Sequence, residues 1–477
     1  MCTLSRIVGR FSRDQQGNIA IIFAIACVPL ISAIGCAIDY SKALQTTAKL
    51  QAAADAASVG SIARTSAAFA EAGSMTVDGP IPDGVGDATK IFSGYIAGIP
   101  NYTLNGVTAP VVTPANPNCT AISTVQVCPT VVKSNGTVSS TVKFSANVPN
   151  TFLGLIGQST MTVTGSSIST ANVPVYVDFY LLLDNSPSMG VGATPADVAT
   201  MVSATSAASF GGNQYCAFAC HDTAKGATDD FYTLAKSLNV TMRIDVLRAA
   251  TQQLMDTAAA PGMQTYANQI RMAIYDFGLS SGTAGLTNVF PLSSSLTSAQ
   301  TAAGTIDLMT VNGQNENNDQ DTDFDTVFAQ INNAISNPGP GSAAAPQKVL
   351  FFVSDGVADE SNSSCLKTMT SATFGNIAPR CMEPINPALC TTLKNRGIKV
   401  AVLYTTYLQL PTNAWYMSWI DPFNAGPFGP SPNSQIAQNM QACATTGYYF
   451  EVSPTQGISE AMGALFQKVL ADARISK

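Results

Sequence analysis

Apolar and polar residues alternate in three ways along the chain, and each way predicts a different kind of element. Residues 19–38 carry no charge over twenty positions, and a helix of that length reaches about 30 Å, the thickness of a bilayer core. The chain then stays rich in Ala, Gln and Lys, which favours a continued helix over 39–72. The first pattern therefore predicts a transmembrane helix with a helical extension.

The second pattern, over residues 73–172, places apolar residues at every second position between Ser and Thr. It is clearest in "TVKFSANVPNTF" (141–152) and "STMTVTGSSIST" (159–170), and Gly, Pro and Asn interrupt it. Period two with such breaks is typical of short strands and turns. The region shows no cluster of acids, bases or metal ligands, so we expect a β-rich stalk or interaction module.

The third pattern, over residues 173–477, alternates apolar runs of strand length with amphipathic segments of helix length. The strand-length runs are 175–184, 270–278, 348–356, 398–406 and 447–452. The amphipathic segments are 243–258, 324–335, 386–396, 434–445 and 458–473. This order predicts an α/β domain with a mostly parallel sheet and helices on both faces.

Charge decides the orientation and excludes one class of partner. Arg6, Arg10 and Arg13 precede the apolar run, so the positive-inside rule places residues 1–18 in the cytoplasm and the chain from residue 39 outside. A cleaved signal peptide is the alternative, but its apolar region is usually shorter. Only 11% of the chain is charged and the net charge is −7. Nucleic-acid binding requires a concentrated basic face, so no nucleic-acid partner is expected.

The segment "RDQQGNIAIIFAIACVPLISAIGCAIDYSKALQTTAKLQAAADAASVGSIA" (13–63) resembles the N-terminal segment of the TadE/TadG-like family. That resemblance implies a single-pass protein of the bacterial inner membrane that belongs to the tight-adherence (Flp) pilus assembly system, with the bulk of the chain periplasmic or exported. Pilin-like members carry a Glu where this chain has Ile22. This departure favours the larger, uncleaved TadG-like branch.

Eight of the eleven cysteines follow the predicted membrane helix, and an even number in an oxidising compartment indicates disulfides. Many connectivities are open, and short separations in sequence favour four pairs: Cys119 with Cys128, Cys216 with Cys220, Cys365 with Cys381, and Cys390 with Cys443. The only histidine, His221, directly follows Cys220. Haem attachment uses a spacing one residue shorter and zinc requires further ligands, so a disulfide loop is favoured there.

Oxygen-bearing side chains collect at the predicted carboxyl ends of two strands. Asp184 ends the first strand of the α/β domain, Ser186 and Ser188 follow it, and Asp355 ends "VLFFVSD". Thr322 stands just before a predicted helix. Ligands of such sheets bind beyond the carboxyl ends of the strands, and two carboxylates with three hydroxyls suit a hard divalent cation such as Mg²⁺ or Mn²⁺.

These five residues resemble the metal-ion-dependent adhesion site (MIDAS) of von Willebrand factor type A domains, whose fold is Rossmann-like. The resemblance implies that Ser186, Ser188 and Thr322 bind the ion directly and that Asp184 and Asp355 act largely through water. The ion, Mg²⁺ first with Mn²⁺ and Ca²⁺ as alternatives, then accepts a carboxylate from a partner. Thr326 is an alternative to Thr322, although helix phase favours the latter.

Enzymatic interpretations have less support. A nucleophilic Ser186 or Ser188 needs a base, and His221 is the single candidate. No Gly-x-Ser-x-Gly elbow or Walker loop is present. A phosphoryl-accepting Asp184 would need a second Asp at the position that Ser186 occupies. The chain is therefore expected not to be an enzyme.

Three long irregular stretches, 191–240, 357–384 and 407–432, follow predicted parallel strands. They leave from the carboxyl edge, so we expect a cap around the cation site. Trp415, Tyr416 and Trp419 either shape its rim or pack into their own domain.

The sequence as a whole predicts a membrane-anchored, extracytoplasmic protein of pilus assembly or adhesion. Its lipid partner is the bilayer around residues 19–38. Its protein partner is part of the pilus machinery, or a surface ligand, that offers a carboxylate to the cation. The alternative is a structural envelope scaffold whose type A domain binds no metal.

Overall fold

The computed structural model divides the chain into two compact units, Met1–Val173 and Pro174–Lys477, with separate hydrophobic cores. The boundary lies one residue after the position at which the sequence predicts the last domain to begin. The structure describes residues 18–75, 77–97, 119–122, 124–134, 136–206, 215–219, 221–222, 230–264, 267–281, 285–311, 321–361, 365–366, 368–371, 375–453 and 457–475.

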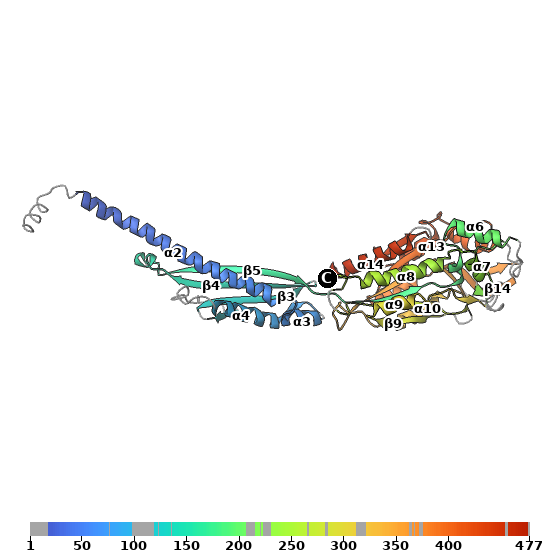
Figure 1. Cartoon of the computed structure of the whole chain (residues 1–477), viewed down its shortest axis with the longest axis horizontal. Helices are drawn as coiled ribbons and strands as arrows, with labels where there is room; N and C mark the ends of the chain where they lie inside the picture. The colour runs from blue at the N-terminus through green and yellow to red at the C-terminus, as the bar shows by residue number, and fades with distance from the viewer. Residues whose placement is uncertain are drawn as a thin grey trace, which may run out of the picture. The chain divides into compact units, whose positions relative to one another are not determined.

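The first unit is built around one long helix, α2 (Asn18–Ser61) (Figure 1). Its N-terminal part exposes large apolar side chains such as Phe23 and Ile31, and by length and composition it can cross a membrane. Its C-terminal part buries Leu50 and Ala54 in a core shared with a sheet. One helix therefore exposes apolar side chains at its N-terminal end and packs against protein at its C-terminal end.

The predicted helical extension over 39–72 is helical except for a break after Ser61. The chain turns at residues 62–66, and a second helix, α3 (Ala67–Ser74), begins there. Ser66 caps α3, because its hydroxyl accepts a hydrogen bond from the N–H of Phe69 at 3.2 Å. The helix is thus interrupted where a serine can cap a new one, although the composition favours helix throughout.

The predicted β-rich region also contains a helix, α4 (Pro82–Ala97). Ala88, Phe92 and Ile96 recur at a spacing of four and are buried against α2 and the sheet, which is helical rather than strand periodicity. The rest is antiparallel sheet in the order β1-β3-β4-β5, with β2 on β3. Its strands are β1 (Gly79–Pro80), β2 (Thr120–Ile122), β3 (Val125–Ser134), β4 (Thr137–Pro149) and β5 (Thr160–Asn172).

The second unit contains a six-stranded sheet in the order β16-β15-β11-β6-β8-β9. All neighbours are parallel except β9, which runs antiparallel at one edge. The edge strand β9 was not among the predicted runs. The strands are β6 (Val177–Leu183), β8 (Ile270–Asp276), β9 (Thr287–Ser293), β11 (Gln347–Ser354), β15 (Lys399–Thr405) and β16 (Tyr449–Val452).

Helices cover both faces of this sheet, as alternate side chains of β6 show. Phe179 and Leu181 belong to one core cluster and Tyr180 and Leu182 to the other, because successive strand residues point to opposite faces. On the first face lie α8 (Arg243–Ala259), α9 (Leu296–Ala303) and α14 (Ile458–Ile475). On the second lie α10 (Phe324–Ala334), α11 (Pro387–Asn395) and α13 (Gln435–Cys443).

The remaining short elements lie in the three insertions and beside them. Residues 357–384, predicted as irregular, include a small antiparallel sheet in the order β12-β14-β13. Tyr416 and Trp419 are buried in the core of their own unit, so packing, not a rim position, is their role. The short elements are η2 (Pro187–Gly190), α6 (Pro195–Ala204), β7 (His221–Asp222), α7 (Phe231–Ser237), β10 (Thr310–Val311), β12 (Val357–Ser361), β13 (Thr368–Ser371), β14 (Gly375–Pro384), η5 (Tyr416–Ile420) and α12 (Asp421–Asn424).

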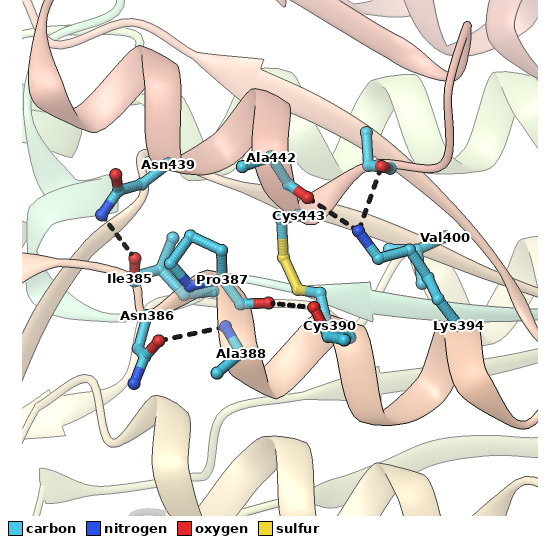
Figure 2. Close-up of a disulfide and its surroundings, with 12 residues drawn as sticks. Ile385, Asn386, Pro387, Ala388, Cys390, Lys394, Val400, Asn439, Ala442 and Cys443 are labelled. Carbon is cyan, nitrogen blue, oxygen red and sulfur yellow. Dashed lines mark hydrogen bonds between the residues drawn. A yellow bond between two sulfur atoms is a disulfide. The ribbon is translucent and has the colours of Figure 1, made fainter.

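Three of the four predicted disulfides are present: Cys119–Cys128, Cys365–Cys381 and Cys390–Cys443. Figure 2 shows the last of them joining α11 to α13 across the second face of the sheet. The fourth is not formed, because Cys216 is a free, buried thiol, and Cys220 lies outside the described residues. Burial raises the pKa of the Cys216 thiol to about 11.

A buried ion-pair cluster aligns the three central strands at their amino ends. Asp178 of β6 accepts two hydrogen bonds from Arg271 of β8, both at 2.7 Å, and one from Lys348 of β11. These residues are direct cross-strand partners in the sheet register. Asp178 is 1% exposed and Lys348 is 5% exposed, so each charge depends on the other for compensation.

We predict that Asp178→Ala destabilises the second unit by about 3–5 kcal/mol, because it leaves Lys348 buried without its counter-charge. Both tryptophans of the chain, Trp415 and Trp419, lie in this unit, so tryptophan fluorescence during denaturation of the detergent-solubilised chain reports on it. The control is Asp256→Ala on the exposed side of α8, with a change within about 0.5 kcal/mol. Equal losses in the two variants would contradict the prediction.

Candidate metal site

Asp184 and Asp355 lie side by side at the carboxyl edge of the sheet. The strands that they follow, β6 and β11, are parallel neighbours, with Leu183 opposite Val353. The N–H of Asp184 donates to the carbonyl of Val353 at 3.0 Å, which continues the pairing by one residue. Both carboxylates are fully buried.

Two serine hydroxyls contact the carboxylate of Asp184, and a third contacts one of these two. Ser186 donates to Oδ1 of Asp184 through its N–H at 3.0 Å and through its hydroxyl at 2.6 Å. The hydroxyls of Ser186 and Ser188 are 3.0 Å apart. Ser354, which the sequence did not single out, donates to Oδ2 of Asp184 at 2.6 Å. The spacing of two residues thus brings the predicted carboxylate and both serines together.

Asn185, between these residues, fixes the turn from the opposite side. Its amide accepts the N–H of Phe277 at 3.0 Å and donates to the carbonyl of Gly278 at 2.8 Å, so the end of β6 is joined to the end of β8. Asp184 contacts β11 through Ser354, whereas the hydrogen bonds of Asn185 hold the turn in place.

Asp355 has a partner that sequence reasoning missed. The guanidinium of Arg243, at the first position of α8, lies 3.2 Å from Oδ2 of Asp355, and the two side chains are 1% and 0% exposed. Arg243 also donates to the carbonyl and hydroxyl of Thr405 at 2.7 and 2.8 Å. A charged residue opening an amphipathic helix is ordinarily solvated, so no sequence signal marked this burial.

Tyr407 completes the enclosure from the third insertion. It is 7% exposed, its hydroxyl is hydrogen-bonded to Ser188, and its ring lies 5.2 Å from the guanidinium of Arg243. Burial, and then the nearby Asp355, raise the pKa of Tyr407 well above its ordinary value. The loop after β15 therefore reaches the site through this side chain.

Thr322 lies beside the segment that follows Asp355. Its N–H and carbonyl pair with those of Asp359 in β12, both at 3.0 Å, and its side chain is buried. The alternative, Thr326, lies inside α10, where its N–H donates to the capping carboxylate of Asp323. Of the two threonines, Thr322 is the one whose backbone pairs with the segment after Asp355. Among the described contacts, the hydroxyls of Thr322 and Thr326 have none with Ser186 or Ser188.

The two carboxylates influence each other electrostatically. Burial, and then the charge of Asp355, raise the pKa of Asp184 to about 6, although the hydrogen bonds from Ser186 and Ser354 act in the opposite direction. A group of like charges in a dry position binds either a proton or a cation more readily than the same groups in water. The site is therefore predisposed to accept positive charge.

The donor set fits a hard cation. Among the described residues, no three His, Cys, Asp or Glu side chains come together as a metal site, so a cation here would depend on hydroxyl and carboxylate oxygens. Ser186, Ser188 and Asp184 supply them within one turn, and Asp355 lies across from them. His221 has another role, since its Nδ1 is 2.8 Å from Asp230 and its ring stacks on Tyr232 at 4.3 Å.

Comparison with known families bears on the first unit. Residues 17–62 match the family model described as "Putative Flp pilus-assembly TadE/G-like". The N-terminal segment is thus similar to that family. The match covers the whole of α2 and confirms the resemblance found in residues 13–63. A comparison with curated proteins found no match.

Several solved structures are similar to this chain at low identity. They include the vWF domain of the type V pili tip protein Mfa5 from Porphyromonas gingivalis (12% identity, 63% of this chain and 97% of that chain, TM-score 0.35). The pilus adhesin SpaC from Lactobacillus rhamnosus GG matches at 13% identity over 73% and 34%, TM-score 0.31. Manganese-loaded TRAP protein of Plasmodium vivax matches at 11% identity over 69% and 78%, TM-score 0.29. Likenesses of this size carry no inference about this chain.

We predict that Arg243→Gln destabilises the second unit by about 3–5 kcal/mol, because it leaves Asp355 buried without its counter-charge. Arg243→Lys retains the charge and loses only the ability to contact Asp355 and Thr405 at the same time. The stability that it loses is therefore expected to be less than half as large. Denaturation followed by tryptophan fluorescence measures both. If the two variants lose the same stability, the charge of Arg243 is not what the site requires.

Proposed function

We propose that this TadE/G-like chain is a membrane-anchored, extracytoplasmic protein of pilus assembly or adhesion. Its second unit would be a von Willebrand factor type A domain that binds a protein partner through a divalent cation. Mg²⁺ is the first choice, held by Asp184, Ser186, Ser188, Thr322 and Asp355. The match of residues 17–62 supports the pilus assignment, and the architecture of the second unit supports the rest.

The observation that carries the proposal is the place of the two aspartates in the sheet. Counted along the chain, the six strands lie in the order third, second, first, fourth, fifth, sixth. The order reverses between β6 and β11, and ligands of doubly wound sheets bind in the crevice at this switch point. Asp184 and Asp355 are the residues that directly follow those two strands.

The chemistry of the oxygens favours a cation that keeps affinity for a further ligand. Serine and threonine hydroxyls are neutral, and the guanidinium of Arg243 already offsets one of the two carboxylates. A cation bound here would be only partly neutralised, and so it would attract a carboxylate from outside. That carboxylate is what the proposed partner, in the pilus machinery or on a surface, would supply.

The apolar part of α2 would hold the protein in the inner membrane by a single pass. Its length and composition suffice to cross a bilayer. The three arginines before it, Arg6, Arg10 and Arg13, would keep the N-terminus in the cytoplasm by the positive-inside rule. The part of the first unit that follows the apolar run, and the whole of the second unit, would then lie in the periplasm or be exported.

One observation favours the second candidate, a scaffold whose type A domain binds no metal. The guanidinium of Arg243 is buried beside Asp355. Its positive charge could therefore compensate the carboxylate in place of a bound metal ion. The two candidates therefore differ on a single measurable point, whether divalent ions stabilise the second unit.

We predict that Mn²⁺ binds the detergent-solubilised chain in calorimetric titration and raises its unfolding midpoint, and that Asp184→Asn abolishes both effects. At a hundredfold excess over the dissociation constant the stabilisation would be about 2.7 kcal/mol. The matched control is Asp276→Asn, because Asp276 is a buried carboxylate at the end of the neighbouring strand β8, with a pKa that burial likewise raises to about 6.

Asp276→Asn should bind Mn²⁺ like the parent chain. Absence of metal-dependent heat and stabilisation in the parent would overturn the adhesion-site proposal and leave the scaffold. Equal loss in both variants would show that the metal is bound elsewhere on this edge.

We also predict that acid weakens the binding. The pKa of Asp184 is raised to about 6 in the metal-free protein, so the folded state gains protons, and relative stability, as the pH falls through 6. Protons then compete with the cation, and the apparent affinity for Mn²⁺ should fall roughly fourfold between pH 7.5 and 5.5. Titrations at several pH values measure this, and an affinity that is constant over the range would exclude Asp184 as a ligand group.

A further inference from the structure

The connection between β4 and β5 is tied to α2 at the end of the apolar run. Asp39, the first residue after that run, is 1% exposed. Its carboxylate accepts three backbone hydrogen bonds, from Thr151 at 2.9 Å and from Phe152 and Leu153 at 2.8 Å. These N–H groups open the short helix η1 (Leu153–Ile156), so a single side chain of α2 determines where η1 lies.

The contact extends into the apolar run itself. Gly35 is buried, and a Cβ at that position would meet the side chain of Phe152 at 2.5 Å. Gly35 precedes Asp39 by four residues, or about 6 Å along a helix. Only glycine allows Phe152 to approach so closely. Through Phe152, the β4–β5 connection contacts the apolar run of α2.

The tip of the connection is apolar, exposed and without charge. Leu155 is 84% exposed and Ile156 is 73% exposed, the two highest values among the large hydrophobic residues exposed in the described structure. The chain carries no Asp, Glu, Lys or Arg between Lys143 and Asp178. Nearby on α2, Tyr40 is 57% exposed and Lys42 donates to the carbonyl of Pro149 at 3.4 Å. Tyrosine and lysine are typical of the level at which a membrane meets water.

We infer that η1 is a second membrane contact, in which Leu155 and Ile156 enter the surface of the same bilayer that α2 crosses. The inference rests on the membrane anchor of the proposed function. If residues 19–38 span the apolar core, Gly35 lies inside it and Asp39 at its boundary. Because η1 is held against both residues, its exposed apolar side chains contact the bilayer. A helix with such a side contact is fixed in rotation as well as in depth.

Tryptophan quenching by brominated lipids tests this in the full chain reconstituted into phosphatidylcholine vesicles. Tryptophan is placed at an exposed position in η1 (Leu155→Trp), in the middle of the apolar run (Ile31→Trp) or far along α2 (Val59→Trp). Ile31 and Val59 are 59% and 61% exposed, which makes them matched positions. The emission of the unsubstituted chain, with Trp415 and Trp419, is subtracted in each lipid.

We expect the added emission to be quenched for Leu155→Trp and Ile31→Trp, and to be retained for Val59→Trp. Quenching at residue 31 but not at 155 would overturn the second contact while leaving the anchor intact. No quenching at residue 31 would overturn the anchor and the contact with it. Both orientations of the chain in the vesicle give the same readout, because η1 follows α2 into whichever leaflet it meets.

A further variant tests the tie. Adding Asp39→Ala to Leu155→Trp removes the acceptor of three N–H groups, so at least half of the quenching at residue 155 should be lost. Ile31→Trp with Asp39→Ala is the control, and its quenching should stay unchanged. If the double variant at residue 155 is quenched as fully as the single one, Asp39 does not position η1.

Discussion

The second unit depends on how charge is accommodated at the two ends of its central strand, β6. At the amino end, Asp178 is neutralised by Arg271 and Lys348. At the carboxyl end, Asp184 and Asp355 have one buried cation between them, Arg243. Burying a charge without a partner is expensive, so the first end is complete by itself and the second retains an excess of negative charge. The same physical rule thus accounts for the paired charges at one edge of the sheet and for the uncompensated carboxylate at the other.

The first unit solves a related problem with a single carboxylate. Asp39 lies where α2 changes from apolar exposure to protein packing, and three backbone N–H groups satisfy it. Below it, Gly35 leaves room for Phe152. The β sheet is therefore attached to α2 at the boundary of the apolar run as well as along its packed half, where Leu50 and Ala54 lie in the core. This attachment makes the apolar run of α2 and the β sheet parts of one folded unit.

Periodicity predicted most elements, and its failures have identifiable causes. All five predicted strands of the second unit exist because continuous apolar runs such as 348–356 suit a strand buried on both faces. The helix α4 was missed because its glycines and prolines suggested turns, although Ala88, Phe92 and Ile96 recur every four residues. The break in the helical extension at residues 62–66 was missed because composition does not reveal a capping serine such as Ser66.

By itself the sequence determined the order of strands and helices, the apolar run of α2 and the group Asp184, Ser186 and Ser188, because each depends on residues close together in the chain. The sequence also predicted Asp355 at the site of Asp184, through the resemblance to a known motif. Only the tertiary structure placed Arg243 against Asp355 and brought η1 to Gly35 and Asp39. These contacts join residues more than fifty positions apart, and their energies come from burial and desolvation. Those terms depend on what surrounds a side chain in space, which local sequence does not specify.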